Sequence, residues 1–130
     1  MKVFISHSER DRELAGDIAE RLGRAGLDVW RDTEIVSGQN FAQQVATALD
    51  SSDAMIVLLS PEWVGSRWGR EEINFALGSA RFEGRVLPVE VRPTPDMPWV
   101  LRHFRHLKLT RDLNRLSAQI VETLAHTSDD

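Results

Sequence analysis

The sequence predicts an α/β fold in which a mostly parallel sheet lies between layers of helices. Short apolar runs alternate five times with stretches of helical spacing, and no longer period repeats along the chain. The connections between these runs are mostly short, as in such folds. Residues 54–59 form the most apolar run, which predicts a central strand that is buried on both faces.

Composition indicates one globular domain, which we place at residues 1–127, with a disordered tail at 128–130. The chain has no cysteine, which excludes thiol catalysis and Cys-based metal sites. With 20 acidic and 16 basic residues, the net charge of -4 favours neither nucleic acid nor a membrane surface as a partner. We find no signal peptide or membrane anchor and therefore expect a cytoplasmic protein.

The first strand is predicted at residues 2–6, an apolar and β-rich run. A capping-box pattern follows, since Ser8 stands three residues before Asp11 at the start of a helix. Gly23 and Gly26 are placed to end this helix. Its apolar stripe consists of Leu14, Ile18 and Leu22.

The second strand is predicted at residues 27–31, and the loop 32–40 that follows is long for a strand-to-helix connection. Excess loop length often serves a function. A second helix is expected at 41–49, because Phe41, Val45 and Leu49 are spaced four apart. The polar residues 50–53 end it.

The central strand is followed by a loop with two tryptophans, Trp63 and Trp68, and then by a helix that opens with Glu71 and Glu72. At helical pitch Trp68 and Glu72 share one face, whereas Glu71 lies about 100 degrees away. The remaining predictions are a strand at 85–91, a proline-rich stretch at 92–98, a weaker strand at 106–109, a last helix at 113–125 and a frayed end at 128–130.

In parallel α/β sheets, ligands bind outside the carboxyl ends of the strands, near the point where the strand order reverses. The segments placed there are 6–11, 32–40 and 60–72. A binding site is therefore expected among these three segments.

Several familiar uses of this architecture do not fit these segments. Dinucleotide and P-loop sites need glycines after the first strand, and residues 6–11 contain none. Ser60 and Pro61 stand where a receiver domain carries its phosphorylated aspartate, and no Gly-x-Ser-x-Gly elbow occurs. We expect no metal site, because only two of the four histidines are close in sequence and surface positions fit all four better.

Three motifs in order resemble the Toll/interleukin-1 receptor (TIR) domain, especially its bacterial members. The motifs are Val3 to Ser8 with Asp11, then Gly26 to Trp30 with Asp32 and Gly38, then Ser60 with Trp63, Ser66, Trp68 and Glu72, and the resemblance as a whole covers about residues 3–125. The resemblance implies a flavodoxin-like three-layer sandwich with five parallel strands in the order 2-1-3-4-5 and helices on both faces. Departures are Ser37 where many members carry proline before Gly38, Gly69 in place of a cysteine, and Phe104-Arg105 in place of a Phe-Trp pair. Because Ser37 and Gly38 lie in the loop that commonly mediates contacts in this family, the choice of partner is open.

The resemblance implies either of two activities, docking onto other TIR domains or cleavage of NAD+. The nicotinamide ring is cationic while it is bonded to the ribose of NAD+, and it leaves as a neutral molecule. Its departure therefore needs no general acid, and one carboxylate beside the ribose can suffice. By resemblance, Glu72 matches the catalytic glutamate and Trp68 the tryptophan of the same Trp-x-x-x-Glu pattern. Trp68 offers a flat face on which a nicotinamide or adenine ring can stack.

Weaker candidates for the rim of the substrate pocket are Ser6, Asp32 and Phe41. Each has a competing structural interpretation: Ser6 as a partner for backbone at a strand end, Asp32 as a loop cap, and Phe41 as a core residue of the second helix. We expect Trp30 and Trp63 to serve mainly in packing.

The first hypothesis is therefore an NAD+ glycohydrolase or ADP-ribosyl cyclase of the TIR type, with NAD+ as substrate and no cofactor. It would deplete NAD+ or make an ADP-ribose signal, as in bacterial anti-phage defence. Self-association through TIR–TIR contacts, other TIR proteins and a downstream effector are the expected partners. The second hypothesis is a non-enzymatic interaction module, an adaptor or an effector that mimics host TIR domains.

Overall fold

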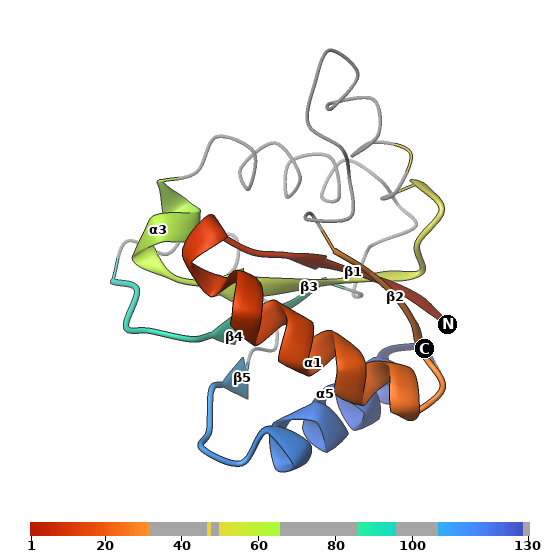
Figure 1. Ribbon diagram of the computed structural model, residues 1–130. Coiled ribbons are helices and arrows are strands. Elements are labelled where there is room, and N and C mark those ends of the chain that lie inside the picture. Colours follow the sequence, from red (N-terminus) through yellow and green to blue (C-terminus); the bar gives the residue numbers. More distant parts are fainter. Residues whose placement is uncertain (32–46, 48–49, 66–85, 96–106, 129–130) are drawn as a thin grey trace.

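The computed structural model describes residues 1–31, 47, 50–65, 86–95 and 107–128. Its centre is a five-stranded sheet in the order β2-β1-β3-β4-β5, and every neighbouring pair of strands is parallel (Figure 1). This confirms the predicted sheet and strand order. The strands are β1 (Lys2–Ser6), β2 (Asp28–Arg31), β3 (Ala54–Leu59), β4 (Val86–Glu90) and β5 (Leu107–Lys108).

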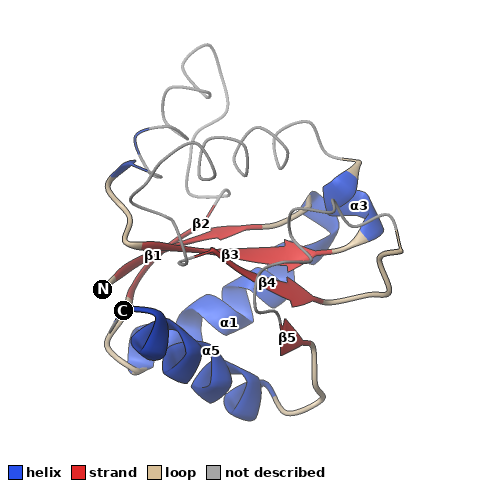
Figure 2. Cartoon of the chain, turned by 180° about the vertical axis from the view of Figure 1, so that it is seen from behind, coloured by secondary structure: helices blue, strands red, loops and turns tan. Residues whose placement is uncertain are grey.

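Two long helices cover the same face of the sheet, α1 (Arg12–Arg24) and α5 (Leu113–Ser128) (Figures 1 and 2). A single-turn helix, α3 (Pro61–Val64), follows β3 directly at its carboxyl end. Among the described residues, no helix is both long and apolar enough to span a membrane.

The core fills both faces of β1 and β3, two of the three inner strands of the sheet. Successive residues of a strand point to opposite faces, so Val3, Ile5 and Ile56 face α1 and α5 and belong to one apolar cluster with Ile18 and Leu116. The alternate residues face the other way and are fully buried as well: Phe4, Met55, Val57 and Leu59. Burial on both faces is what the uninterrupted apolar run of β3 predicts. The helix expected at 41–49 and the helix expected to open with Glu71 and Glu72 fall largely outside the described residues.

The start of α1 differs from the predicted capping box. A 3-10 turn, η1 (Glu9–Asp11), precedes α1, and the side chain of Ser8 caps no backbone N–H. Ser8 Oγ instead donates a hydrogen bond to Asp11 Oδ2 over 3.0 Å. The physical reason is that the Asp11 carboxylate turns toward an arginine from a distant part of the chain, described below.

The end of α1 follows the prediction for Gly26, whereas Gly23 lies inside the helix, which continues to Arg24. Gly26 has φ 95°, which is the left-handed conformation that glycine adopts without strain. The Leu27 N–H donates to the Leu22 carbonyl over 3.1 Å and the Gly26 N–H to the Gly23 carbonyl over 3.0 Å, which is the hydrogen-bond pattern of a Schellman motif.

Three other boundaries differ from expectation. Trp63 lies within α3 and not in a loop, because Ser60 and Pro61 supply a helix start directly after β3. The strand β5 comprises Leu107–Lys108, so within the described residues it ends one residue before the predicted end at 109. The helix α5 continues to Ser128, so that residue belongs to the helix and not to a frayed end.

Candidate functional site at the switch point of the sheet

The strand order reverses between β1 and β3, since β2 lies on one side of this pair and β4 on the other. The two strands are paired up to Ser6 and Val57, and both run in the same direction, so their carboxyl ends meet at one edge. Ligands of open α/β sheets bind at such a switch point. The segments after β1 and β3 are therefore the candidate functional site.

The start of α3 is fixed by its own sequence. Ser60 occupies the N-cap position, and its Oγ accepts a hydrogen bond from the backbone N–H of Trp63 over 3.1 Å. Pro61 follows at the first helical position, where the absent N–H costs nothing. An N-cap serine is worth about 1 kcal/mol relative to alanine. The sequence Ser60-Pro61 thus ends the central strand and starts the helix.

Trp63 joins α3 to the end of β1. Its side chain is fully buried, and its indole Nε1 donates a hydrogen bond to Ser6 Oγ over 2.9 Å. Ser6 is fully buried too. The structure thus gives Ser6 a structural role, as a partner of an indole and not of the backbone, while contact with a substrate stays a prediction. The packing role predicted for Trp63 is confirmed.

Asp11 is held by an arginine from the segment after β4. Arg92 Nη1 and Nη2 donate hydrogen bonds to Asp11 Oδ1 and Oδ2 over 2.8 and 2.9 Å, and Asp11 is 4% exposed. A bidentate arginine is the partner that neutralises a buried carboxylate best. This pairing explains why the Asp11 carboxylate is turned away from the helix start.

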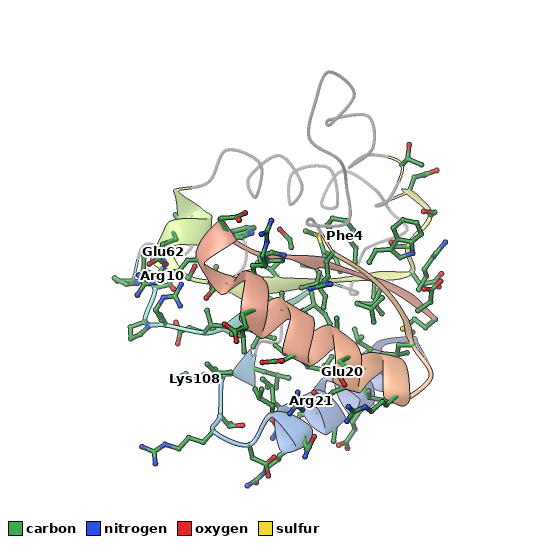
Figure 3. The ribbon with its side chains drawn as sticks, in the orientation of Figure 1. Phe4, Arg10, Glu20, Arg21, Glu62 and Lys108 are labelled. Carbon is green, nitrogen blue, oxygen red and sulfur yellow. The ribbon has the colours of Figure 1, made fainter. Side chains whose placement is uncertain are left out.

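Glu62, on α3, completes the cluster. Its Oε2 accepts from Arg92 Nη2 over 2.9 Å, and its Oε1 accepts from Arg10 Nη1 over 2.5 Å. Figure 3 shows Arg10 and Glu62 beside each other at the end of the sheet where α3 lies. One guanidinium, that of Arg92, therefore connects the segments that follow β1, β3 and β4.

The charges of this cluster balance, with two guanidiniums against two carboxylates. The hydrogen bond from Arg92 and the backbone N–H of Glu62 itself, with a lesser contribution from Arg10, lower the pKa of Glu62 from 4.5 to about 2, although desolvation acts in the opposite direction. Asp11 first, and Glu62 second, raise the pKa of Arg92 above its ordinary range. Glu62 therefore remains ionised at neutral pH and is unsuited to donate a proton.

One histidine departs from the predicted surface position. His7, directly after β1, is 7% exposed, and its Nδ1 lies 2.8 Å from the carbonyl oxygen of Ser8. Within the described ranges no three acidic or histidine side chains converge as metal ligands. The expectation that the site uses no metal stays a prediction.

Of the residues predicted for the site, the structure describes Ser6. The other candidates lie outside the described residues and keep their predicted roles: Trp68, Glu72, Asp32, Phe41, Ser37 and Gly38. Sequence reasoning missed the pairing of Arg92 with Asp11 and Glu62. The available signal was positional, because all three residues stand just after predicted strands.

The chain is similar in sequence to known proteins. A family model described as a TIR domain matches residues 3–125. The 2′ cyclic ADP-D-ribose synthase BtTIR of Bacteroides thetaiotaomicron is 30% identical over 131 aligned positions, covering 98% of this chain and 42% of that protein. The probable 2′ cyclic ADP-D-ribose synthase TcpO of Methanobrevibacter olleyae is 30% identical over 89 residues, or 67% of this chain and 26% of that protein. The NAD(+) hydrolase TirS of Staphylococcus aureus is 33% identical over 72 residues, or 54% of this chain and 26% of that protein. The chain thus spans less than half the length of these relatives.

Solved structures show the same fold. The TIR domain of the Toll-related receptor TRR-2 from Hydra magnipapillata superposes with a TM-score of 0.77 at 21% identity, covering 98% of both chains. A chain of the RPS4 and RRS1 TIR domain heterodimer superposes with a TM-score of 0.70 at 14% identity, covering 100% of both. At these identities the likeness concerns the fold alone.

Proposed function

The chain belongs to the TIR domain family, and we propose that it cleaves NAD+ at the bond between nicotinamide and ribose. One observation carries the proposal: a relative named as a 2′ cyclic ADP-D-ribose synthase matches 98% of the chain at 30% identity. Two further relatives, matched over 67% and 54% of the chain, are named as a probable synthase of the same kind and as an NAD+ hydrolase. The proposal thus concerns the chemistry of this domain.

The proposed reaction breaks the bond between the ribose C1′ and the nicotinamide nitrogen. The bonding electrons leave with nicotinamide, which becomes neutral, and positive charge builds on the ribose. Water or a hydroxyl of the same molecule then bonds to C1′ and loses a proton, giving linear or cyclic ADP-ribose. Because the leaving group is already cationic, the protein needs to stabilise charge and not to supply an acid.

We assign to Glu72 the stabilisation of the positive charge that builds on the ribose. Trp68 is the ring on which nicotinamide or adenine would stack. The described part of the candidate site supports this assignment indirectly. Asp11 and Glu62 are both paired with Arg92, so neither is a carboxylate available to the ribose. Asp32 and Phe41 are proposed to line the rim of the same pocket.

We further propose that the reaction either depletes NAD+ or makes an ADP-ribose signal that a downstream effector reads. A role in anti-phage defence is the biological setting in which such a domain would act. Clustering with other copies or other TIR proteins, through the loop that contains Ser37 and Gly38, is the proposed means of activation.

The test is incubation of the purified protein with NAD+, with nicotinamide, linear ADP-ribose and cyclic ADP-ribose separated by chromatography. We expect Glu72→Ala to abolish nicotinamide release while the circular dichroism spectrum is unchanged. Glu71→Ala is the matched control, because it removes the neighbouring carboxylate and should retain activity. Equal nicotinamide release by Glu72→Ala and the parent would refute the assignment.

A second candidate function is a non-enzymatic module that binds other TIR domains. The observation that favours it is the fold shared with the RPS4 and RRS1 TIR domains, which were solved as a heterodimer. The same incubation separates the two functions. A protein that releases no nicotinamide at any concentration, but forms a complex with a second TIR domain, would support the module.

A further inference from the structure

The helix α3 is too short to hold its own position. It has four residues, Pro61–Val64, and a single isolated turn is unstable in water because nucleation costs more than one hydrogen bond returns. Its placement therefore depends on contacts with the rest of the sheet edge. The structure provides such contacts at Trp63, which donates to Ser6, and at Glu62, which accepts from Arg92.

The contact at Trp63 reaches back 57 residues to Ser6 at the end of β1, and the contact at Glu62 joins α3 to two further segments through charged groups. Glu62 is bound to Arg92, 30 residues later, and to Arg10, 52 residues earlier. Arg92 is at the same time fixed by its two hydrogen bonds to the buried Asp11. Glu62 therefore attaches α3 to a guanidinium whose own position is already fixed by the buried Asp11 carboxylate.

The chain that follows α3 carries the two residues to which the proposed reaction is assigned. Trp68 stands four residues and Glu72 eight residues after Val64, the last residue of α3. A displacement of a catalytic group by about 1 Å can cost about 10²-fold in rate. We therefore expect the orientation of α3 to affect how a carboxylate at position 72 meets its substrate.

We infer that the Glu62–Arg92 ion pair is a positioning device, which holds α3 so that the following segment presents Glu72 to the ribose of NAD+. This inference rests on the proposed function, since it assigns Glu62 a part in that reaction. Glu62 is a positioning residue and not a catalytic one, because its carboxylate is already bound by two arginines.

Glu62→Ala is the informative variant, because it removes the link without leaving a buried charge. Arg92 keeps the Asp11 carboxylate as its partner, and the Glu62 side chain is one-third exposed. We expect kcat for nicotinamide release to fall about tenfold, while KM changes less than about twofold, since misplacement of Glu72 affects the reacting geometry more than ground-state binding. Circular dichroism is expected to match the parent.

Two controls separate positioning from a general loss of charge or stability. Glu20→Ala removes another ion-paired carboxylate, which is more exposed than that of Glu62 and is paired with Arg24 on the part of α1 that Figure 3 shows far from Glu62. Ile120→Val loosens the fully buried core on the α5 side. Both variants are expected to retain the kcat of the parent within about twofold.

Hydrogen exchange supplies a readout that does not depend on NAD+. In Glu62→Ala we expect faster amide exchange in the peptide covering residues 61–72, with α1 and α5 unchanged, whereas Glu20→Ala leaves that peptide as in the parent. Unchanged exchange in that peptide, or a kcat equal to that of the parent, would overturn the inference. A parent protein that releases no nicotinamide would refute the proposed function, and the exchange experiment would still decide whether Glu62 holds the segment.

Discussion

The indole nitrogen of Trp63 donates a hydrogen bond to the hydroxyl oxygen of Ser6 over 2.9 Å, between two side chains that are both fully buried. Ser6 ends β1 and Trp63 lies in α3, so this bond joins the two segments that flank the switch point. It is made by side chains 57 residues apart in the sequence. The candidate site is thus bounded by a buried polar contact as well as by apolar packing.

Ser6→Ala is expected to destabilise the protein by about 1–3 kcal/mol, because the indole N–H of Trp63 is then buried without its acceptor. The free energy of unfolding from urea titration measures this change. Ser117→Ala is the matched control, since Ser117 is also buried but its hydroxyl has no hydrogen-bond partner among the described residues. That substitution on α5 should be neutral or stabilising, because alanine is the better helix former. Equal losses in the two variants would contradict the importance of the Ser6–Trp63 bond.

Acid should weaken the contribution of Glu62 to the free energy of unfolding. Its pKa is lowered to about 2 in the folded protein from 4.5, so folding favours the ionised form. The stabilisation is complete above pH 4.5 and is lost as the pH falls toward 2. Glu62→Gln, which cannot ionise, should therefore be clearly less stable than the parent near neutral pH and approach the parent in acid. Urea titrations at several pH values between these limits measure the difference, and a difference independent of pH would contradict the Arg92–Glu62 pairing.

Sequence patterns predicted the sheet well because its strands are specified locally. The six apolar residues of β3 predicted a central, fully buried strand, and the structure has that strand with the predicted bounds. Gly26 likewise predicted the end of α1 correctly. In both cases the information lies within a few residues of the element itself.

The polar part of the site was less accessible to such reasoning because its partners are far apart in the chain. Ser8 and Asp11 read as a capping box, but Asp11 is bound by Arg92, 81 residues away. The acceptor of the Trp63 indole, Ser6, is similarly remote. A local pattern can indicate that a residue is polar at a strand end, and only the folded sheet determines which charge it meets.

The two glycines at the end of α1 should respond to alanine in opposite ways. Gly26 has φ 95°, a conformation in which a Cβ costs roughly 1–2 kcal/mol, so Gly26→Ala should lower the free energy of unfolding by that amount. Gly23 lies inside the helix, and a Cβ there meets no atom within 4 Å. Gly23→Ala should therefore stabilise the protein by about 0.5–1 kcal/mol. Thermal unfolding of both variants tests the pair, and a loss of stability in both would show that the Schellman motif does not explain the helix end.

Nicotinamide release per molecule should rise with protein concentration. If the loop containing Ser37 and Gly38 of one copy completes the site of the next, the active fraction follows the fraction of associated copies, which increases by mass action. Initial rates measured over a hundredfold range of protein concentration, and again with copies tethered on a scaffold, test this expectation. Glu72→Ala, tethered in the same way, is the control for release that does not come from the site. A rate per molecule that stays constant over the whole range would mean that a single copy holds a complete site, and the Ser37–Gly38 loop would then have to serve partner recognition and not catalysis.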